Sequence, residues 1–369
     1  MPTLGEQTGY SRPKYLIVGS SEPYSGKTST ILGLAEKLQT RGLNIGYSKP
    51  LGTCLNATEK DGIDEDVRFL GKTLDLPHNN LGETLLFLEP DTIAKQLQGD
   101  DRRDYPESFL QSLQGLQGDL VLVEGPSTLD RGRLFDLSVP QMSALLESPV
   151  LLVTRFHSVL DTAALICVKE RLGDRLLGIV LTDIPADEWE RASHVVAPFL
   201  EGRGIPVFGL LPMSNLLHSV SVEQLVRRLK AEVLCCHDRL DLMVETLRIG
   251  AMNVNSALKY FSAADNMAVI TGGDRTDIQL AALETATNCL ILTGHLPPTP
   301  MIISRAEELE IPVLSVDLDT LTTVEIIEQT LGHVRLYEPI KVEYIKHAIA
   351  EHFALDRLLD ALGLDPVAV

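Results

Sequence analysis

The residues best suited to chemistry lie near the N-terminus, in the segment Gly19-Ser20-Ser21-Glu22-Pro23-Tyr24-Ser25-Gly26-Lys27-Thr28. Its last four residues form the Ser-Gly-Lys-Thr core of a phosphate-binding loop, although Ser21 stands where the GxxxxGK[ST] pattern has its first glycine. In such a loop, N–H groups at a helix start hold phosphates, the lysine reaches the terminal phosphates and the threonine hydroxyl binds Mg²⁺. The alternative is a helix that starts at a glycine beside an unrelated lysine. We predict that ATP, or another nucleoside triphosphate, is bound by Ser25, Gly26, Lys27, Thr28 and Ser29.

Two further segments end in charged residues. Glu124 ends the run 119–124 and is expected at the carboxyl edge of a central strand, where a hard oxygen ligand would face the Mg²⁺ held by Thr28. Lys49 ends the second strand at the same edge; it would contact phosphate or an anionic substrate, or it is an ordinary solvated strand end. We assign Lys27 and Lys49 as the candidate catalytic residues. Asp64, Glu65 and Asp66 begin an apparent helix, whose dipole favours acids in the first turn.

The elements that must position these residues alternate along the first half of the chain. Helical periodicity covers residues 26–38, and short apolar runs typical of strands cover 14–19, 44–48, 119–124, 149–154, 176–182 and 206–211. Continuous apolar runs separated by helices indicate buried parallel strands. We therefore predict an α/β fold, a doubly wound parallel sheet forming a P-loop nucleotide-binding domain over residues 14–213.

A second, smaller α/β domain is predicted over residues 219–332. Its expected strands are 232–235, 267–271, 289–293 and 312–316, with helices at 274–287 and 300–310. Residues 333–369 form a helical tail, because 341–362 spaces its apolar residues as an amphipathic helix or helix pair does. We expect this tail to pack on its own domain; the alternative is a contact between subunits.

The loop core, the segment Tyr47-Ser48-Lys49-Pro50 and the strand end Val123-Glu124-Gly125 together resemble dethiobiotin synthetase and its relatives among ATP-dependent amidoligases. The resemblance covers about residues 15–213. It implies an ATP–Mg²⁺ site made of Lys27, Thr28, Lys49, Asp66 and Glu124, in which Thr28, Asp66 and Glu124 are the metal ligands. The chain departs from the family at Pro126-Ser127-Thr128, which replaces the glycine-rich stretch of the carbamate chemistry. Thr182-Asp183 replaces the base-reading asparagine, so Asp183 is our candidate at the base.

The second domain carries Thr271-Gly272-Gly273-Asp274-Arg275-Thr276-Asp277, which resembles the motif of DRTGG domains, known beside nucleotide-sensing modules. A dethiobiotin-synthetase-like domain followed by a DRTGG domain is the arrangement at the front of long phosphate acetyltransferases. The chain is thus similar to their N-terminal, regulatory half, and we expect their acetyltransferase domain to be absent. The asparagines in 250–255 and the strand end Thr293-Gly294-His295 complete this pattern, or they are ordinary loop residues.

Composition narrows the classes of partner. Among 369 residues, 32 Lys and Arg stand against 51 Asp and Glu, which gives a net charge of −19. Such a surface repels phosphate backbones and anionic lipid, so nucleic acid and membrane are not expected partners. The N-terminus lacks the apolar core of a signal peptide, and the five cysteines and nine histidines show no disulfide or zinc spacing. We expect a cytoplasmic protein.

Two functions follow from these features. The first is an ATP- and Mg²⁺-binding protein with a regulatory or scaffolding role, a small-molecule effector at the DRTGG-like domain, and a homodimer or larger even oligomer. The alternative is an ATP-dependent ligase or slow ATPase acting on a small anionic substrate held by Lys49. Phosphate acetyltransferase activity is not expected, because no segment remains to form that active site.

Overall fold

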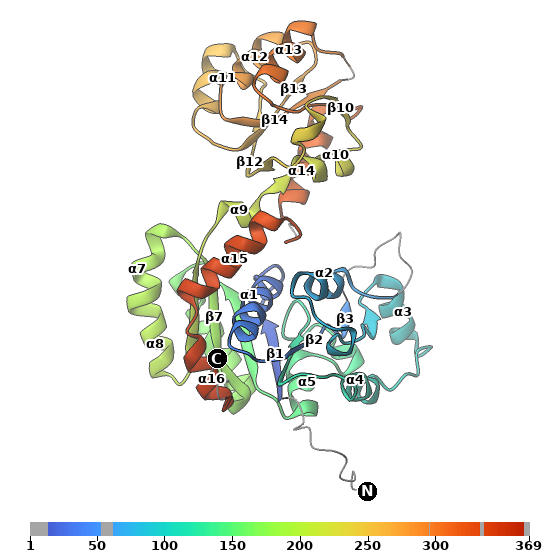
Figure 1. Ribbon diagram of the computed structural model, residues 1–369, viewed down its shortest axis with the longest axis vertical. Coiled ribbons are helices and arrows are strands. Elements are labelled where there is room, and N and C mark those ends of the chain that lie inside the picture. The colour runs from blue at the N-terminus through green and yellow to red at the C-terminus, as the bar shows by residue number, and fades with distance from the viewer. Residues whose placement is uncertain (1–13, 53–61, 295, 333–335, 365–369) are drawn as a thin grey trace, which may run out of the picture. The chain divides into compact units, whose positions relative to one another are not determined.

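The computed structural model describes residues 14–52, 62–294, 296–332 and 336–364, which form two compact units. The first unit comprises Met1–Met213 together with Tyr337–Val369, and the second comprises Ser214–Leu336. The chain therefore leaves the first unit after Met213 and returns to it at Tyr337 (Figure 1). Within the described ranges, we find no helix with the length and apolar character needed to cross a membrane.

The first unit is built on a six-stranded sheet with the order β2-β5-β1-β6-β7-β8. The strands are β1 (Lys14–Ser20), β2 (Ile45–Ser48), β5 (Leu120–Glu124), β6 (Val150–Arg155), β7 (Leu176–Ile184) and β8 (Val207–Pro212). All neighbouring strands are parallel, which confirms the predicted fold class.

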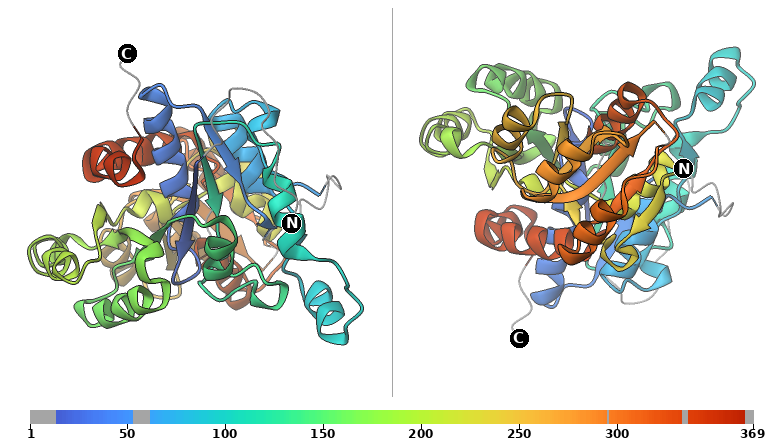
Figure 2. Two further views of the ribbon diagram at one scale, coloured as in Figure 1. Left: turned by 90° about the horizontal axis from the view of Figure 1, so that it is seen from below. Right: turned by 90° about the horizontal axis from the view of Figure 1, so that it is seen from above.

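Helices cover both faces of this sheet (Figure 2). Ile17 and Val121 pack with Phe109 and Val139 in one cluster, whereas the alternate residues, such as Leu16, point to the other face and are equally buried. Burial of both alternations explains why the strands are continuous apolar runs. Helix α1 (Lys27–Thr40) follows β1 directly, so the predicted strand–loop–helix is present.

The C-terminal helices belong to the first unit, although the sequence places them directly after the second domain. Helices α15 (Pro339–His352) and α16 (Leu355–Leu362) lie beside α1 and β8 (Figures 1 and 2). Gly33 of α1 permits this packing, since a Cβ there would lie 2.5 Å from Cγ1 of Ile349. The apolar side of α15 therefore packs on elements that lie far from it in the sequence, namely α1 and β8.

The second unit contains a five-stranded sheet with the order β10-β15-β14-β13-β12. Its strands are β10 (Glu232–Cys235), β12 (Thr246–Ile249), β13 (Met267–Gly272), β14 (Thr287–Thr293) and β15 (Val313–Ser315). Its main helices are α10 (Val222–Leu229), α11 (Val254–Phe261), α12 (Thr276–Leu283), α13 (Pro300–Glu308) and α14 (Thr320–Gly332). Strand β10 runs antiparallel to β15, and the other neighbours are parallel. Strand β12 was not predicted, because this half-buried edge strand lacks a continuous apolar run.

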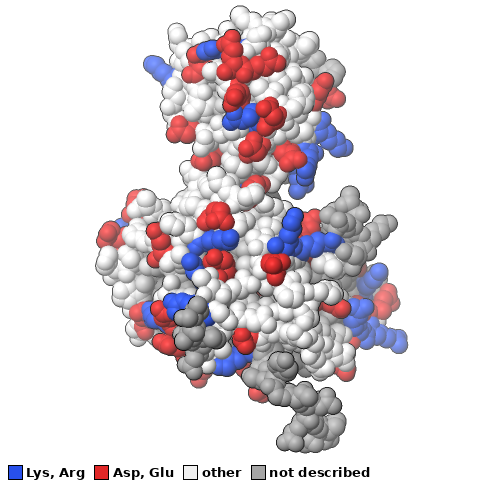
Figure 3. Space-filling view, viewed as in Figure 1, with Lys and Arg blue, Asp and Glu red and all other residues white. Residues whose placement is uncertain are grey.

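Charged side chains are mixed on the face shown in Figure 3, where Lys and Arg lie among Asp and Glu instead of forming one broad basic patch. Local ion pairs occur in the second unit, for example between Arg305 and Glu284 at 2.8 Å and between Arg227 and Glu223.

Candidate functional site

The phosphate-binding loop turns into α1 at Gly26, whose φ of 85° lies in the left-handed region that glycine tolerates best. The helix has no side-chain cap and no acid in its first turn. Its first N–H groups and the positive end of its dipole are thus suited to an anion. The Oγ atom of Ser25 is buried and has no hydrogen-bond partner among the described residues, which is the kind of orphaned group that a bound ligand would satisfy.

Lys27 lies in the first turn of α1 and is almost fully buried. Its Nζ donates a hydrogen bond to Oγ of Ser20, at 2.9 Å, at the end of β1. Burial lowers the pKa of the Lys27 ammonium, and Glu124 opposes this shift. A desolvated ammonium at this place would gain strongly from a phosphate group.

Thr28 and Glu124 meet across the carboxyl edge of the sheet. The Thr28 hydroxyl donates to Oε1 of Glu124 at 3.1 Å, and the hydroxyl of Tyr47 donates to Oε2 at 2.7 Å. The register of the strands accounts for these contacts. Glu124 lies opposite Val18 of β1, and Val123 lies opposite Ser48 of β2, so β5 ends beside the ends of both neighbouring strands. Glu124 is 3% exposed, and burial raises its pKa. These oxygens form a donor set that suits Mg²⁺.

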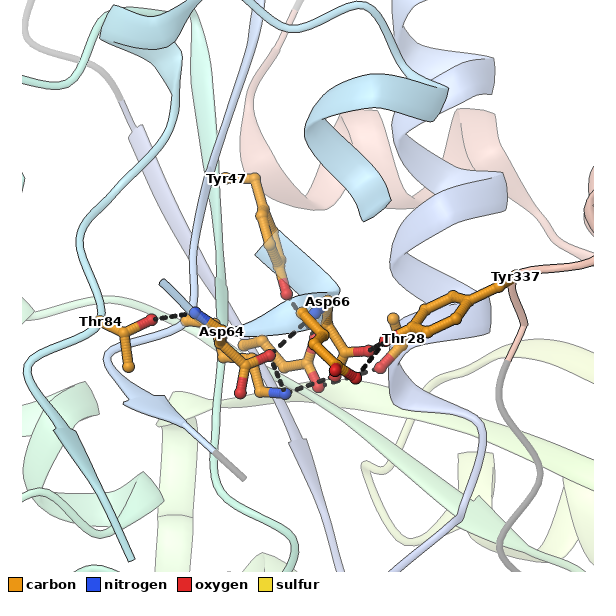
Figure 4. A network of polar contacts seen from close by, with 9 residues as sticks. Thr28, Tyr47, Asp64, Asp66, Thr84 and Tyr337 are labelled. Carbon is orange, nitrogen blue, oxygen red and sulfur yellow. Dashed lines mark hydrogen bonds and ion pairs between the residues drawn. The ribbon is translucent and has the colours of Figure 1, made fainter. Parts of the chain in front are cut away.

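Lys49 is not a solvated strand end, since it is only 3% exposed. Its Nζ lies 2.9 Å from Oδ1 of Asp64 and also pairs with Oδ2 of Asp66 (Figure 4). Although burial would lower its pKa, Glu124 and the two aspartates raise it, so the ammonium stays charged. The lysine is already matched by two carboxylates in this arrangement.

Asp64 and Asp66 come from the start of helix α2 (Glu65–Thr73). Asp64 is the N-cap residue and accepts a hydrogen bond from the N–H of Asp66 at 2.9 Å. Asp64 therefore caps helix α2, and acids at this end of a helix were expected from the helix dipole. The same side chain also pairs with Lys49. Together with Lys27, Lys49 and Glu124, the two aspartates form a cluster of two positive and three negative groups.

Asp183 does not join this cluster among the described contacts. It lies in β7 with a left-handed φ of 54°, and its Oδ2 is 3.1 Å from Nε of Arg155. Its neighbour Thr182 donates to the backbone oxygen of Ser25 at 2.9 Å, which ties this strand to the phosphate-binding loop. Ser29 follows Thr28 in the first turn of α1 and is partly exposed.

Sequence reasoning missed Tyr47, Ser20 and the pairing role of Asp64. Tyr47 precedes Lys49 by two residues, and residues at this spacing share one side of an extended chain. That spacing was the available signal for Tyr47. Ser20 and Asp64 left no comparable signal, because they lie 7 and 15 residues from their partners Lys27 and Lys49, a separation that predicts no contact.

No group of three or more His, Cys, Asp or Glu side chains among the described residues is arranged to hold a metal by itself. Mg²⁺ commonly takes one or two protein ligands and completes its shell with water and substrate phosphates. The Thr28–Glu124 pair beside the phosphate-binding loop fits that mode of binding.

The DRTGG-like segment of the second unit is held together by its own contacts. Arg275 pairs with Asp277 at 2.9 Å and donates to the backbone oxygen of Met252. The buried side chain of Gln279 donates to the oxygens of Gly272 and Gly273. Among the other polar residues we singled out, Asn253 caps α11 and the Thr293 hydroxyl lies 2.9 Å from that of Thr320. His295 lies outside the described residues.

Comparison with known proteins agrees with these two units. Residues 14–221 match the family model described as an AAA domain, and residues 224–330 match the DRTGG domain. Phosphate acetyltransferases of Nitratidesulfovibrio vulgaris and Nitrosomonas europaea are 25% and 23% identical, over 91% and 92% of this chain but 49% and 50% of theirs. The chain thus spans about half the length of these relatives and corresponds to their N-terminal half.

Solved structures are more distant. The septum site-determining protein MinD of Pyrococcus horikoshii, complexed with Mg-ADP, matches with 19% identity and a TM-score of 0.35, over 56% of this chain and 83% of its own. The CBS and DRTGG domains of a Clostridium perfringens pyrophosphatase match with 21% identity and a TM-score of 0.29, over 47% of this chain and 85% of theirs. From the match over residues 14–221, the chain belongs to the AAA domain family, here followed by a DRTGG domain.

Proposed function

We propose that the chain binds a nucleoside triphosphate, ATP in the first instance, together with Mg²⁺, and that it acts as a nucleotide-binding regulatory protein. The observation that carries the proposal is the meeting of the Lys27–Thr28 helix start with Glu124 at one edge of the sheet. A cation for phosphate, free N–H groups and an oxygen pair for Mg²⁺ are the parts that a nucleotide–metal site needs.

Each residue would have a defined role at this site. Ser25 and Gly26 would bring backbone N–H groups to the phosphates, and Lys27 would neutralise the terminal ones. Thr28 and Glu124 would hold Mg²⁺, with Asp66 nearby as a further ligand. The bound metal would offset phosphate charge, and the buried position of Glu124 would strengthen its attraction to the metal.

The ligase alternative finds less support. It required Lys49 to hold an anionic substrate, but both Asp64 and Asp66 already pair with this ammonium. An anion would have to compete with two carboxylates for one buried charge. We therefore propose binding and regulation as the primary function.

The second unit is where we propose that an effector acts. An open surface pocket of about 430 Å³ lies there, lined by Glu232, Leu234, Pro297, Pro298, Ile303 and Ser315. It lies near the carboxyl end of β15, the side where ligands of open α/β sheets bind.

We further propose that the full chain forms a homodimer or a larger even oligomer.

Titration calorimetry with ATP and Mg²⁺ tests the proposal. Lys27→Ala should weaken binding by about 1.5–3 kcal/mol, tenfold or more, because a charge-assisted contact to phosphate is lost. Lys37→Ala, near the other end of α1, is the matched control and should bind as the wild type does. Equal binding by wild type and Lys27→Ala would refute the nucleotide site. Phosphate release under the same conditions separates a regulator from a slow ATPase.

A further inference from the structure

The chain returns from the second unit next to the candidate metal site. Tyr337 is the first residue of the first unit after Ser214–Leu336. Its hydroxyl lies 3.4 Å from Oδ1 of Asp66 (Figure 4) and equally far from Oε2 of Glu65. Its ring packs against Phe69, with the ring centroids 4.9 Å apart. The start of α2 is thus held from outside by the returning chain.

Both carboxylate oxygens of Asp66 have partners. Oδ2 pairs with the buried Lys49, and Oδ1 accepts from Tyr337. A metal that binds beside Thr28 and Glu124 and also takes Asp66 as a ligand would compete with these two contacts for the carboxylate. Metal binding should displace whichever of the two contacts is weaker.

The contact with Tyr337 is the weaker of the two. Lys49 is 3% exposed, so losing one of its carboxylates would leave a buried charge less well compensated. Tyr337 is 36% exposed and its contact is long, so water can replace Asp66 as the partner of the hydroxyl. A metal at this site should therefore displace Tyr337 and leave the Lys49 pair intact.

The following residues limit where that displacement can go. Glu338 is the N-cap residue of α15, and Lys341 is fully buried with its Nζ 3.2 Å from Oε2 of Glu338. Helix α15 is packed on α1, where Gly33 admits Ile349. The C-terminal side of Tyr337 is therefore held by helix α15.

We propose that Tyr337 is a latch on Asp66 that opposes metal–nucleotide binding in the first unit. The proposal rests on the nucleotide function above. With the latch closed, Asp66 is engaged and metal binding is disfavoured; with metal–nucleotide bound, Tyr337 is released. By linkage, an effector that releases Tyr337 would strengthen metal–nucleotide binding. Bound metal–nucleotide would strengthen the binding of that effector by the same factor.

The test uses the full chain and Tyr337→Phe, which keeps the ring on Phe69 and removes the hydroxyl. ATP affinity is measured by calorimetry in excess Mg²⁺ and in a chelator, and the ratio gives the gain from metal. This gain should rise about two- to fivefold in Tyr337→Phe, the lower part of what one hydrogen bond contributes. Tyr344→Phe is the matched control, since its hydroxyl makes no hydrogen bond among the described residues, and its gain should equal that of the wild type.

Hydrogen exchange supplies a second readout. In the wild type, Mg²⁺ and ATP should speed exchange in the peptide that begins at 336, and Tyr337→Phe should show the faster exchange without ligand. An unchanged or smaller gain from metal in Tyr337→Phe, or slower exchange in this peptide on binding, would overturn the latch. If wild type binds no nucleotide at all, the proposed function fails; if it binds but is indifferent to Tyr337, only the latch fails.

Discussion

Replacing Tyr47 by Phe removes one hydroxyl from the centre of the candidate metal site. That hydroxyl donates to Oε2 of Glu124 at 2.7 Å, and the two side chains are 1% and 3% exposed. The pKa of Tyr47 is raised well above its usual value by burial and by Glu124, so the phenol is protonated at neutral pH and can donate. No water can easily replace it, because both groups are buried.

The expected loss follows from this burial. Removing the donor leaves a buried carboxylate oxygen without its partner, which costs about 1.5–3 kcal/mol when the acceptor is charged. The free energy of unfolding of the ligand-free protein should fall by that amount at pH 7. Since the Tyr47 bond lowers the pKa of Glu124, its loss should raise that pKa further and reduce the gain in ATP affinity from Mg²⁺.

Urea unfolding at fixed pH and calorimetry with and without Mg²⁺ measure the two effects. Tyr15→Phe is the control, because its hydroxyl donates at 3.3 Å to the neutral backbone oxygen of Leu113 and should cost about 0.5–1.5 kcal/mol. If Tyr47→Phe is no more destabilising than Tyr15→Phe and the gain from Mg²⁺ is unchanged, Tyr47 does not hold Glu124 as we argue.

Three further predictions concern pH, tail packing and assembly. Burial raises the pKa of Glu124, so the gain in ATP affinity from Mg²⁺ should weaken as pH falls towards that raised value; calorimetry across pH should show a smaller slope in Glu124→Gln. In the ligand-free protein the sign is opposite: this carboxyl favours folding below its ordinary pKa and loses that contribution as pH rises through the raised value. Gly33→Ala should lower the free energy of unfolding by about 1–3 kcal/mol, because its Cβ would lie 2.5 Å from Cγ1 of Ile349. A smaller loss in a background of Ile349→Ala would trace the cost to this contact, whereas equal losses would point elsewhere. Light scattering should give an even oligomer for the full chain at micromolar concentration, and a monomer would contradict the assembly proposal.

Local sequence was enough for the sheet of the first unit. Its strands are continuous apolar runs because both of their faces are buried, and such runs are readable without knowing the neighbours. The glycine start of α1 was readable for a similar reason, since the loop, the helix and the preceding strand are adjacent in the chain. Half-buried β12 escaped prediction because an edge strand leaves a weaker pattern.

The sequence by itself determined the two α/β units, the phosphate-binding loop and the presence of Glu124 at a strand end, all features written in adjacent residues. Only the tertiary structure decided that Lys49 is buried between Asp64 and Asp66, that Tyr47 holds Glu124, and that the tail packs on α1 and not on the second unit. Those contacts join segments far apart in the chain. The free energy of these contacts depends on desolvation and on close packing between surfaces that exist only once the sheet has formed. No local pattern of residues therefore predicts them.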